Sequence, residues 1–177
     1  MGKNRTDGIN PEVGCIMVSQ ADNVYFMPQS LTNLLVHLVF STMERHPFLS
    51  DPGLRGEMHH YLGGIINEKG GHSLGIGGIA DHVHLLVVVP KTTSVADLVR
   101  DLKRSSSIWI KERDPALGKF AWQGGYGAFS VGQTECEVVK AYIGNQEEHH
   151  KTRSFQEEYR ALLDKYRIAY DERYVWE

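Results

Sequence analysis

A chain of 177 residues is long enough to fold as one domain around a sizeable hydrophobic core. Hydrophobic residues make up 41% and charged residues 23%, which is the ordinary composition of a globular domain. No apolar run approaches the roughly 18 residues that a membrane-spanning helix needs, so the sequence predicts no membrane span. The formal net charge of −3 argues against a chain that is basic throughout, so nucleic-acid binding would need a local basic face.

The N-terminal region shows no sign of a secretory signal or of regular structure. Its longest apolar stretch, residues 15–18, is too short for a signal peptide, and the two cysteines have neither metal-motif nor disulfide spacing. These features predict a cytoplasmic protein. Residues 1–27 carry Gly, Asn and Asp without a sustained period, so we expect a flexible N-terminal extension followed by a single domain over residues 28–177.

The first half of the domain predicts a strand, a helix and two more strands. Residues 34–40 form a short apolar run that is typical of a buried strand. Asp51 and Pro52 then favour the start of a helix, which Gly70 and Gly71 end. Two strands follow, at residues 73–79 and 82–89, and the second gives the strongest strand pattern in the chain.

The second half predicts one strand among three helices. Ser94 is expected to cap a long helix. A strand is expected at residues 128–131, and Thr134 with Glu137 predicts a capping box for a helix that runs to about residue 150. A last helix is expected at about residues 154–166. The order β-α-β-β-α-β followed by helices indicates an α+β fold, a ferredoxin-like split β-α-β sheet with helices on one face and a C-terminal helix bearing Tyr142.

Two histidines stand at the start of the best strand. Because side chains alternate between the faces of a strand, His82 and His84 are expected to project from the same face and to be able to bind one cation. The intervening Val83 and the following Leu85 would face the core. A structural, hydrogen-bonded histidine pair is the alternative. The adjacent pairs His59-His60 and His149-His150 are interpreted as surface residues, because neighbours on a helix diverge by about 100°.

The helix that follows residue 134 carries a phenol and an amide on one face. Tyr142 and Gln146 are four residues apart, so their side chains lie about one turn from each other. A phenol can attack phosphorus, and an amide oxygen can bind a hard cation. A helical tyrosine is nevertheless far more often a packing residue, so this pattern alone does not establish a site.

The long helix after Ser94 supplies a local basic face. Four of its cationic side chains recur at helical spacing and are candidates for DNA phosphate contact, although a solvated helix surface explains each of them equally well: Arg100, Lys103, Arg104 and Lys111. Trp122 and Tyr126, in the glycine-rich loop that follows, are candidates for stacking on unpaired bases, with core packing the alternative for at least one of them.

A His-hydrophobic-His strand followed by Tyr-x-x-x-Gln on a helix resembles the single-tyrosine HUH transposases of small bacterial insertion sequences. The resemblance runs from about residue 27 to residue 177 and takes in residues 36–42, 80–86, 98–106, 126–131 and 142–146. It implies that His82, His84 and Gln146 bind one Mg²⁺ or Mn²⁺ ion. It also implies that Tyr142 attacks a scissile phosphate, forming a 5′-phosphotyrosine link and releasing a 3′-hydroxyl.

The same resemblance implies the partners of the chain. Such proteins act as homodimers on single-stranded DNA that folds into hairpins near the ends of the element, and the tyrosine helix of one subunit can serve the histidines of the other. Two other functions stay open on the sequence alone. One is a metal-dependent hydrolase that activates water and dispenses with Tyr142; the other is a domesticated, non-catalytic hairpin-binding protein.

Overall fold

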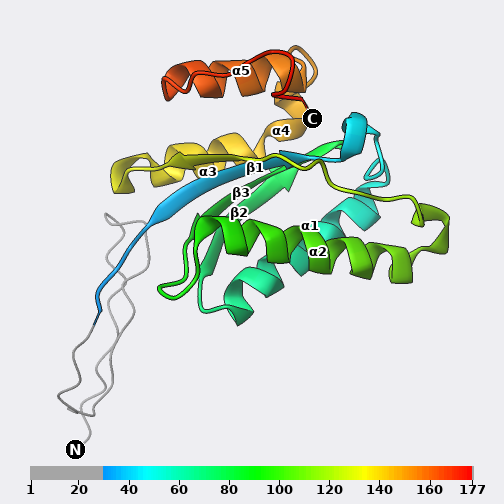
Figure 1. Cartoon of the computed structure of the whole chain (residues 1–177), viewed down its shortest axis with the longest axis horizontal. Coiled ribbons are helices and arrows are strands. Elements are labelled where there is room, and N and C mark those ends of the chain that lie inside the picture. The colour runs from blue at the N-terminus through cyan, green and yellow to red at the C-terminus, as the bar shows by residue number, and fades with distance from the viewer. Residues whose placement is uncertain (1–29, 177) are drawn as a thin grey trace, which may run out of the picture.

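The computed structural model describes residues 30–176, so the predicted N-terminal extension lies outside the described residues. The described chain follows the expected order β-α-β-β-α-β and then three helices (Figure 1). The strands are β1 (Leu35–Ser41), β2 (His72–Gly78), β3 (His82–Val88) and β4 (Gly127–Ser130). The helices are α1 (Pro52–Glu68), α2 (Val95–Arg113), α3 (Cys136–Gly144), α4 (Gln146–His149) and α5 (Phe155–Lys165), with short 3-10 turns at Met43–Arg45, Pro115–Leu117 and Gln133–Glu135.

The four strands form one antiparallel sheet in the order β2-β3-β1-β4. In this order, β3 lies between the two strands of the first β-α-β unit, and β1 lies between the two strands of the second. This interleaving confirms the predicted ferredoxin-like split β-α-β sheet. The central strands β1 and β3 pair along their whole length, from Leu35 opposite Val88 to Ser41 opposite His82. The histidine-bearing strand therefore lies in the middle of the sheet, where its backbone is fixed on both sides.

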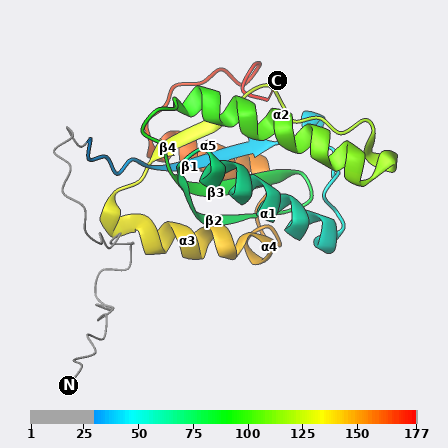
Figure 2. The ribbon, with the colours of Figure 1, turned by 90° about the horizontal axis from the view of Figure 1, so that it is seen from below.

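Helices cover both faces of the sheet. Viewed from below (Figure 2), α1 and α2 run across one face, whereas α5 lies behind the sheet. Alternate residues of β3, including Val83 and Leu85, pack with α1 and α2 in the main hydrophobic core. On the opposite face, α3 packs against Leu86, and α5 packs against Val39 and Phe129. We call these the α1/α2 face and the tyrosine face.

The helix starts follow side-chain capping, with one correction. Asp51 Oδ1 accepts a hydrogen bond from the Leu54 amide at 2.7 Å, and Ser94 Oγ accepts one from the Asp97 amide at 3.0 Å, as predicted. The expected capping box of Thr134 with Glu137 does not form. A 3-10 turn precedes α3, so the capping carboxylate is two residues earlier: Glu135 accepts from the Gly132 amide at 3.3 Å.

The tyrosine-bearing helix does not run unbroken to residue 150. It ends at Gly144, and Asn145, with φ −107° and ψ 21°, separates α3 from the single turn of α4. The break redirects the chain toward α5 above the sheet (Figure 1). Among the described residues, no helix combines the length and the apolar character that crossing a membrane requires.

Candidate metal and nucleophile site

Strand β3 places its two histidines as the alternation predicts. His82 and His84 are both fully buried on the tyrosine face, and the intervening Val83 belongs to the core on the α1/α2 face. Their ring centroids are 5.1 Å apart. The sequence-based expectation that both imidazoles project from one face of a central strand is therefore confirmed.

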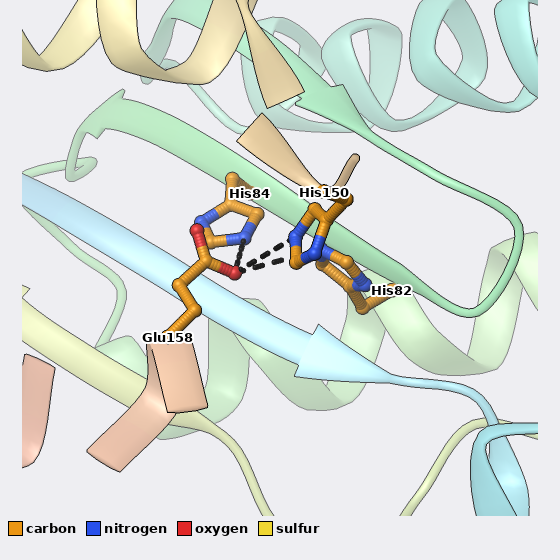
Figure 3. Close-up of side chains that lie close together, drawn as sticks. All are labelled: His82, His84, His150 and Glu158. Carbon is orange, nitrogen blue, oxygen red and sulfur yellow. Dashed lines mark hydrogen bonds and ion pairs between the residues drawn. The ribbon is translucent and has the colours of Figure 1, made fainter. Parts of the chain in front are cut away.

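A carboxylate from the last helix lies between these imidazoles and a third one. The Oε2 atom of Glu158 is 3.8 Å from His82 Nε2, 3.3 Å from His84 Nε2 and 3.0 Å from His150 Nε2. Figure 3 shows the three rings converging on this oxygen from β3 and from the end of α4. One donor atom from each of the four residues lies within 4.8 Å of all the others.

Outer partners aim these imidazoles at the centre. Asp81 Oδ1 lies 2.7 Å from His82 Nδ1, and His37 Nε2 lies 2.9 Å from His84 Nδ1. A backbone carbonyl 2.8 Å away engages Nδ1 of His150 in the same way. With Nδ1 occupied, each ring presents Nε2 inward, which is the arrangement in which protein histidines bind metal ions.

The protonation state of His84 suits cation binding. Burial lowers the pKa of His84 to about 4, and burial together with the neighbouring His84 lowers the pKa of His37 to about 3. Both rings are therefore neutral at neutral pH, the form that ligates metals. Burial alone would raise the pKa of Glu158, but the hydrogen bond from His150 and the electrostatic interaction with nearby His84 outweigh it and hold that pKa below its usual range.

One buried nitrogen in this group has no hydrogen bond among the described residues. His84 Nε2 lies 3.3 Å from Glu158 Oε2 but without the alignment of a hydrogen bond. Leaving a buried polar atom unsatisfied typically costs about 1–3 kcal/mol. A divalent cation between these atoms would satisfy it, so the residues present fit a metal ion.

The nucleophile candidate meets the same carboxylate. The Tyr142 hydroxyl donates a hydrogen bond to Glu158 Oε1, and Gln146 Nε2 donates to the same oxygen at 2.9 Å. The amide oxygen of Gln146 lies 3.4 Å from His82 Nε2. Burial, and next the hydrogen bond to Glu158, raise the pKa of Tyr142, so the phenol is protonated at neutral pH. The structure thus brings the predicted tyrosine and glutamine to the predicted histidines within one chain.

Two members of this group were not predicted as site residues. The interpretation of the His149-His150 pair as surface residues is wrong for His150, whose side chain is only 5% exposed. The sequence did contain an indication of this, because His150 follows Gln146 by four residues. At that spacing the two side chains lie on the same side of a helical turn. Glu158 lies on the buried stripe of α5 with Phe155 and Leu163, a position where a carboxylate needs partners.

A cleft opens beside the tyrosine. It has a volume of about 250 Å³ and is bordered by Tyr142, Glu158 and two cationic side chains, Arg153 and Lys165. The Arg153 residue is exposed, and the side chain of Lys165 is 58% exposed. A phosphate that reached the tyrosine hydroxyl from this side would pass both positive charges.

The predicted basic face of α2 lies on the other side of the sheet, and two of its members already have partners. Arg100 pairs with Asp97 at 2.5 Å and with Asp101 at 3.1 Å. Lys103 donates to the carbonyl of Gln123 at 2.7 Å and to that of Gly125 at 2.6 Å. The remaining two, Arg104 and Lys111, are exposed.

The two aromatic residues of the following loop have different surroundings. Trp122 is 7% exposed, packs edge-on against Phe40 and donates to Ser106 Oγ at 2.8 Å. Tyr126 is 39% exposed beside Lys103. Core packing therefore accounts for Trp122, and only Tyr126 stays available for stacking on a base.

A central H-x-H strand facing a helical tyrosine is the arrangement that the sequence resemblance implies, and comparison with known proteins identifies the family. The family "Transposase IS200 like" matches residues 30–146, and the chain belongs to this family. No curated protein sequence matches it. A candidate transposase of Deinococcus radiodurans R1 is similar in structure, with 25% identity, a TM-score of 0.54 and coverage of 70% of this chain and 98% of that one. A REP-associated tyrosine transposase bound to a REP hairpin shares the fold at 11% identity, with a TM-score of 0.53 and coverage of 72% and 74%.

Proposed function

We propose that this transposase cleaves and rejoins single-stranded DNA through a covalent link to Tyr142. The observation that carries the proposal is the shared carboxylate: Glu158 accepts the hydrogen bond of the Tyr142 hydroxyl with one oxygen and faces the imidazoles of β3 with the other. The nucleophile and the candidate metal ligands are thus held within a few ångströms of one another, as in-line attack at a single phosphate requires. The activity is assigned to the domain at residues 28–177.

The chemical step is an exchange of one phosphate ester for another. The Tyr142 oxygen forms a bond to phosphorus while the bond from phosphorus to the 3′-oxygen breaks, leaving a 5′-phosphotyrosine and a free 3′-end. The phenol proton leaves along its hydrogen bond to Glu158 Oε1 and passes on to water, and the departing 3′-oxygen takes a proton from water in return. Attack by a different 3′-hydroxyl reverses these changes and joins new ends without ATP.

A divalent cation is part of the proposal. When bound, Mg²⁺ or Mn²⁺ would polarise the scissile phosphate and stabilise negative charge on the attacking oxygen. His82 and His84 would hold it through Nε2, and the family resemblance implies the Gln146 amide oxygen as a third ligand. Such a positive charge would favour ionisation of Tyr142, because a phenol has an ordinary pKa of about 10 and burial raises it further here.

Single-stranded DNA with hairpins is the proposed substrate. Membership of the transposase family supports DNA as the partner, and the REP hairpin bound to a protein of the same fold supports the hairpin. Arg153 and Lys165 are assigned to phosphates near the scissile bond, because they border the cleft beside Tyr142. Arg104 and Lys111 are assigned to phosphates of the hairpin stem. A homodimer is expected from the resemblance, although the tyrosine meets the histidines of its own chain.

The test follows the two products of cleavage. Hairpin DNA labelled at either end is incubated with protein and a divalent ion, and the products are then denatured. The 3′-end label should stay with wild-type protein, and the 5′-end label should run free. Tyr142→Phe removes one oxygen and should abolish both signals while binding stays within about tenfold, since phosphate contacts dominate affinity.

Other outcomes would replace the proposal. Cleavage without a protein-bound label would favour the metal-dependent hydrolase that uses water. Hairpin binding without any cleavage by the wild type would favour the non-catalytic binding protein. Mixing Tyr142→Phe protein with a His82→Ala, His84→Ala double variant tests where each site is assembled. A site built within one chain leaves the mixture inactive, whereas restored cleavage would show that subunits share their helices.

A further inference from the structure

The four-residue group at the centre of the tyrosine face contains more ligands than the family resemblance implies. We propose that the metal ion is held by three imidazoles and one carboxylate, from His82, His84, His150 and Glu158, and that it is therefore a transition-metal ion rather than Mg²⁺. Gln146 is then a positioning residue. The inference rests on the proposed function only in taking this to be the metal site of the cleavage reaction.

The distances match a single ion. Two ligands bonded to one metal at about 2.1 Å with tetrahedral angles are roughly 3.4 Å apart. The separations from Glu158 Oε2 to the three Nε2 atoms, 3.0 to 3.8 Å, span that value. All four side chains are nearly or fully buried, and the unsatisfied Nε2 of His84 lies 3.3 Å from Glu158 Oε2 (Figure 3). These atoms require only small shifts to surround a cation.

The chemistry of the donor set determines the type of ion. Mg²⁺ requires an octahedral shell of oxygen ligands and usually retains several waters. Imidazole nitrogens instead suit zinc, copper, iron and nickel, and the affinities of divalent first-row metals for such sites generally follow the Irving–Williams order. Three neutral imidazoles and one carboxylate leave a net charge of +1 with a divalent ion, which favours the approach of a phosphate oxygen.

The orientation of Gln146 supports its role as a positioning residue. Its amide nitrogen donates to Glu158 Oε1 at 2.9 Å, and so fixes the carboxylate that faces the imidazoles. Rotating the amide to present its oxygen to the carboxylate would set two acceptors against each other. The same Oε1 accepts the Tyr142 hydroxyl, so Glu158 would connect the metal ion directly to the nucleophile.

The metal-binding test needs neither DNA nor activity. Co²⁺ is titrated into the full metal-free chain, and its visible d–d absorption reports the number and type of ligands. We expect one Co²⁺ per chain, displaced by equimolar Zn²⁺ but not by a large excess of Mg²⁺. His150→Gln and Glu158→Gln should each weaken Co²⁺ binding by about a hundredfold or more, and Gln146→Ala by a smaller factor of about tenfold.

Two matched controls remove the same chemistry elsewhere. His60→Gln replaces an exposed histidine of α1, and Glu157→Gln replaces the neighbour of Glu158 while retaining its capping role at the start of α5. Both should bind Co²⁺ like the wild type. Should a site variant fail to fold by circular dichroism, X-ray absorption of the Zn²⁺-loaded wild type still counts the imidazoles, and three are expected.

The failures of the two proposals can be told apart. Unchanged Co²⁺ affinity in folded His150→Gln and Glu158→Gln, a count of two imidazoles, or displacement by Mg²⁺ at comparable concentration would overturn the ligand set and leave the transposase mechanism standing. A covalent DNA adduct that survives Tyr142→Phe would overturn the mechanism and leave the metal site standing.

Discussion

The two faces of the sheet use the same strands for different purposes. On the α1/α2 face, Val83 and Leu85 pack into an apolar core that also contains Phe40. On the tyrosine face, the alternate residues His82 and His84 surround a buried carboxylate. Because a strand directs successive side chains to opposite faces, a rigid core on one side can fix imidazoles on the other without contacting them. The main apolar core and the candidate metal site therefore lie on opposite faces of one sheet.

The largest expected effect on stability is on the α1/α2 face. Leu85→Ala should lower the free energy of unfolding by about 2–5 kcal/mol, because it leaves a cavity in a fully buried core. His84→Gln should change it by less than about 1.5 kcal/mol while removing Co²⁺ binding, since this position serves the site rather than the core. Urea denaturation measures both values. Equal losses would show that the two faces contribute to stability alike.

The contact between sheet and tyrosine helix should be the next most sensitive. A Cβ atom at Gly77 would clash with the backbone carbonyl of Ile143, next to Tyr142, whereas one at Gly75 would meet Lys140 at an ordinary 3.7 Å. Gly77→Ala should therefore cost about 1–3 kcal/mol and reduce cleavage by tenfold or more by displacing α3. Gly75→Ala on the same strand is the control, expected within about 0.5 kcal/mol of the wild type. Normal cleavage by Gly77→Ala would show that α3 tolerates displacement.

Basic side chains on both faces should contribute to DNA binding, but only those on the tyrosine face should affect cleavage. Replacing Arg153 and Lys165 with alanine should make the plot of log binding constant against log salt concentration less steep, by about one to two units of slope. The same change should also slow cleavage, because both residues border the cleft at Tyr142. Replacing Arg104 and Lys111 should flatten the slope similarly but leave cleavage of bound DNA unchanged. Binding at several salt concentrations and single-turnover cleavage measure the two effects. An unchanged slope in the second variant would make the α2 face plain solvated surface.

The effect expected to be smallest at neutral pH is a pH dependence from outside the histidine cluster. Burial, and next the nearby Arg55, lower the pKa of His59 on α1 from its ordinary value of 6.5 to about 4. Between these two values the unfolded chain binds more protons at this residue, so its contribution makes stability fall as pH drops from about 6.5 to 4. His59→Gln should reduce the loss of thermal stability over that range relative to the wild type. An identical pH profile would show that His59 titrates normally in the folded protein.

Several features of this protein could be predicted from the sequence because each depends on spacing within one element. The alternation of a strand put His82 and His84 on one face, and the helical repeat put Tyr142 near Gln146. The order of strand and helix patterns was enough to predict the split β-α-β sheet. The family resemblance then linked the strand to the helix, which spacing alone does not do.

The tertiary structure decided which elements meet. The turn at Asn145 moved His150 from an expected surface to the centre of the site, and the packing of α5 against β1 and β4 brought Glu158 between the imidazoles. Tertiary packing also directs Lys103 to loop carbonyls and buries Trp122 in the core. Spacing fixes the direction of a side chain only relative to its own helix or strand. The residues that a side chain contacts depend on how separate elements pack together, and a local sequence pattern does not determine that packing.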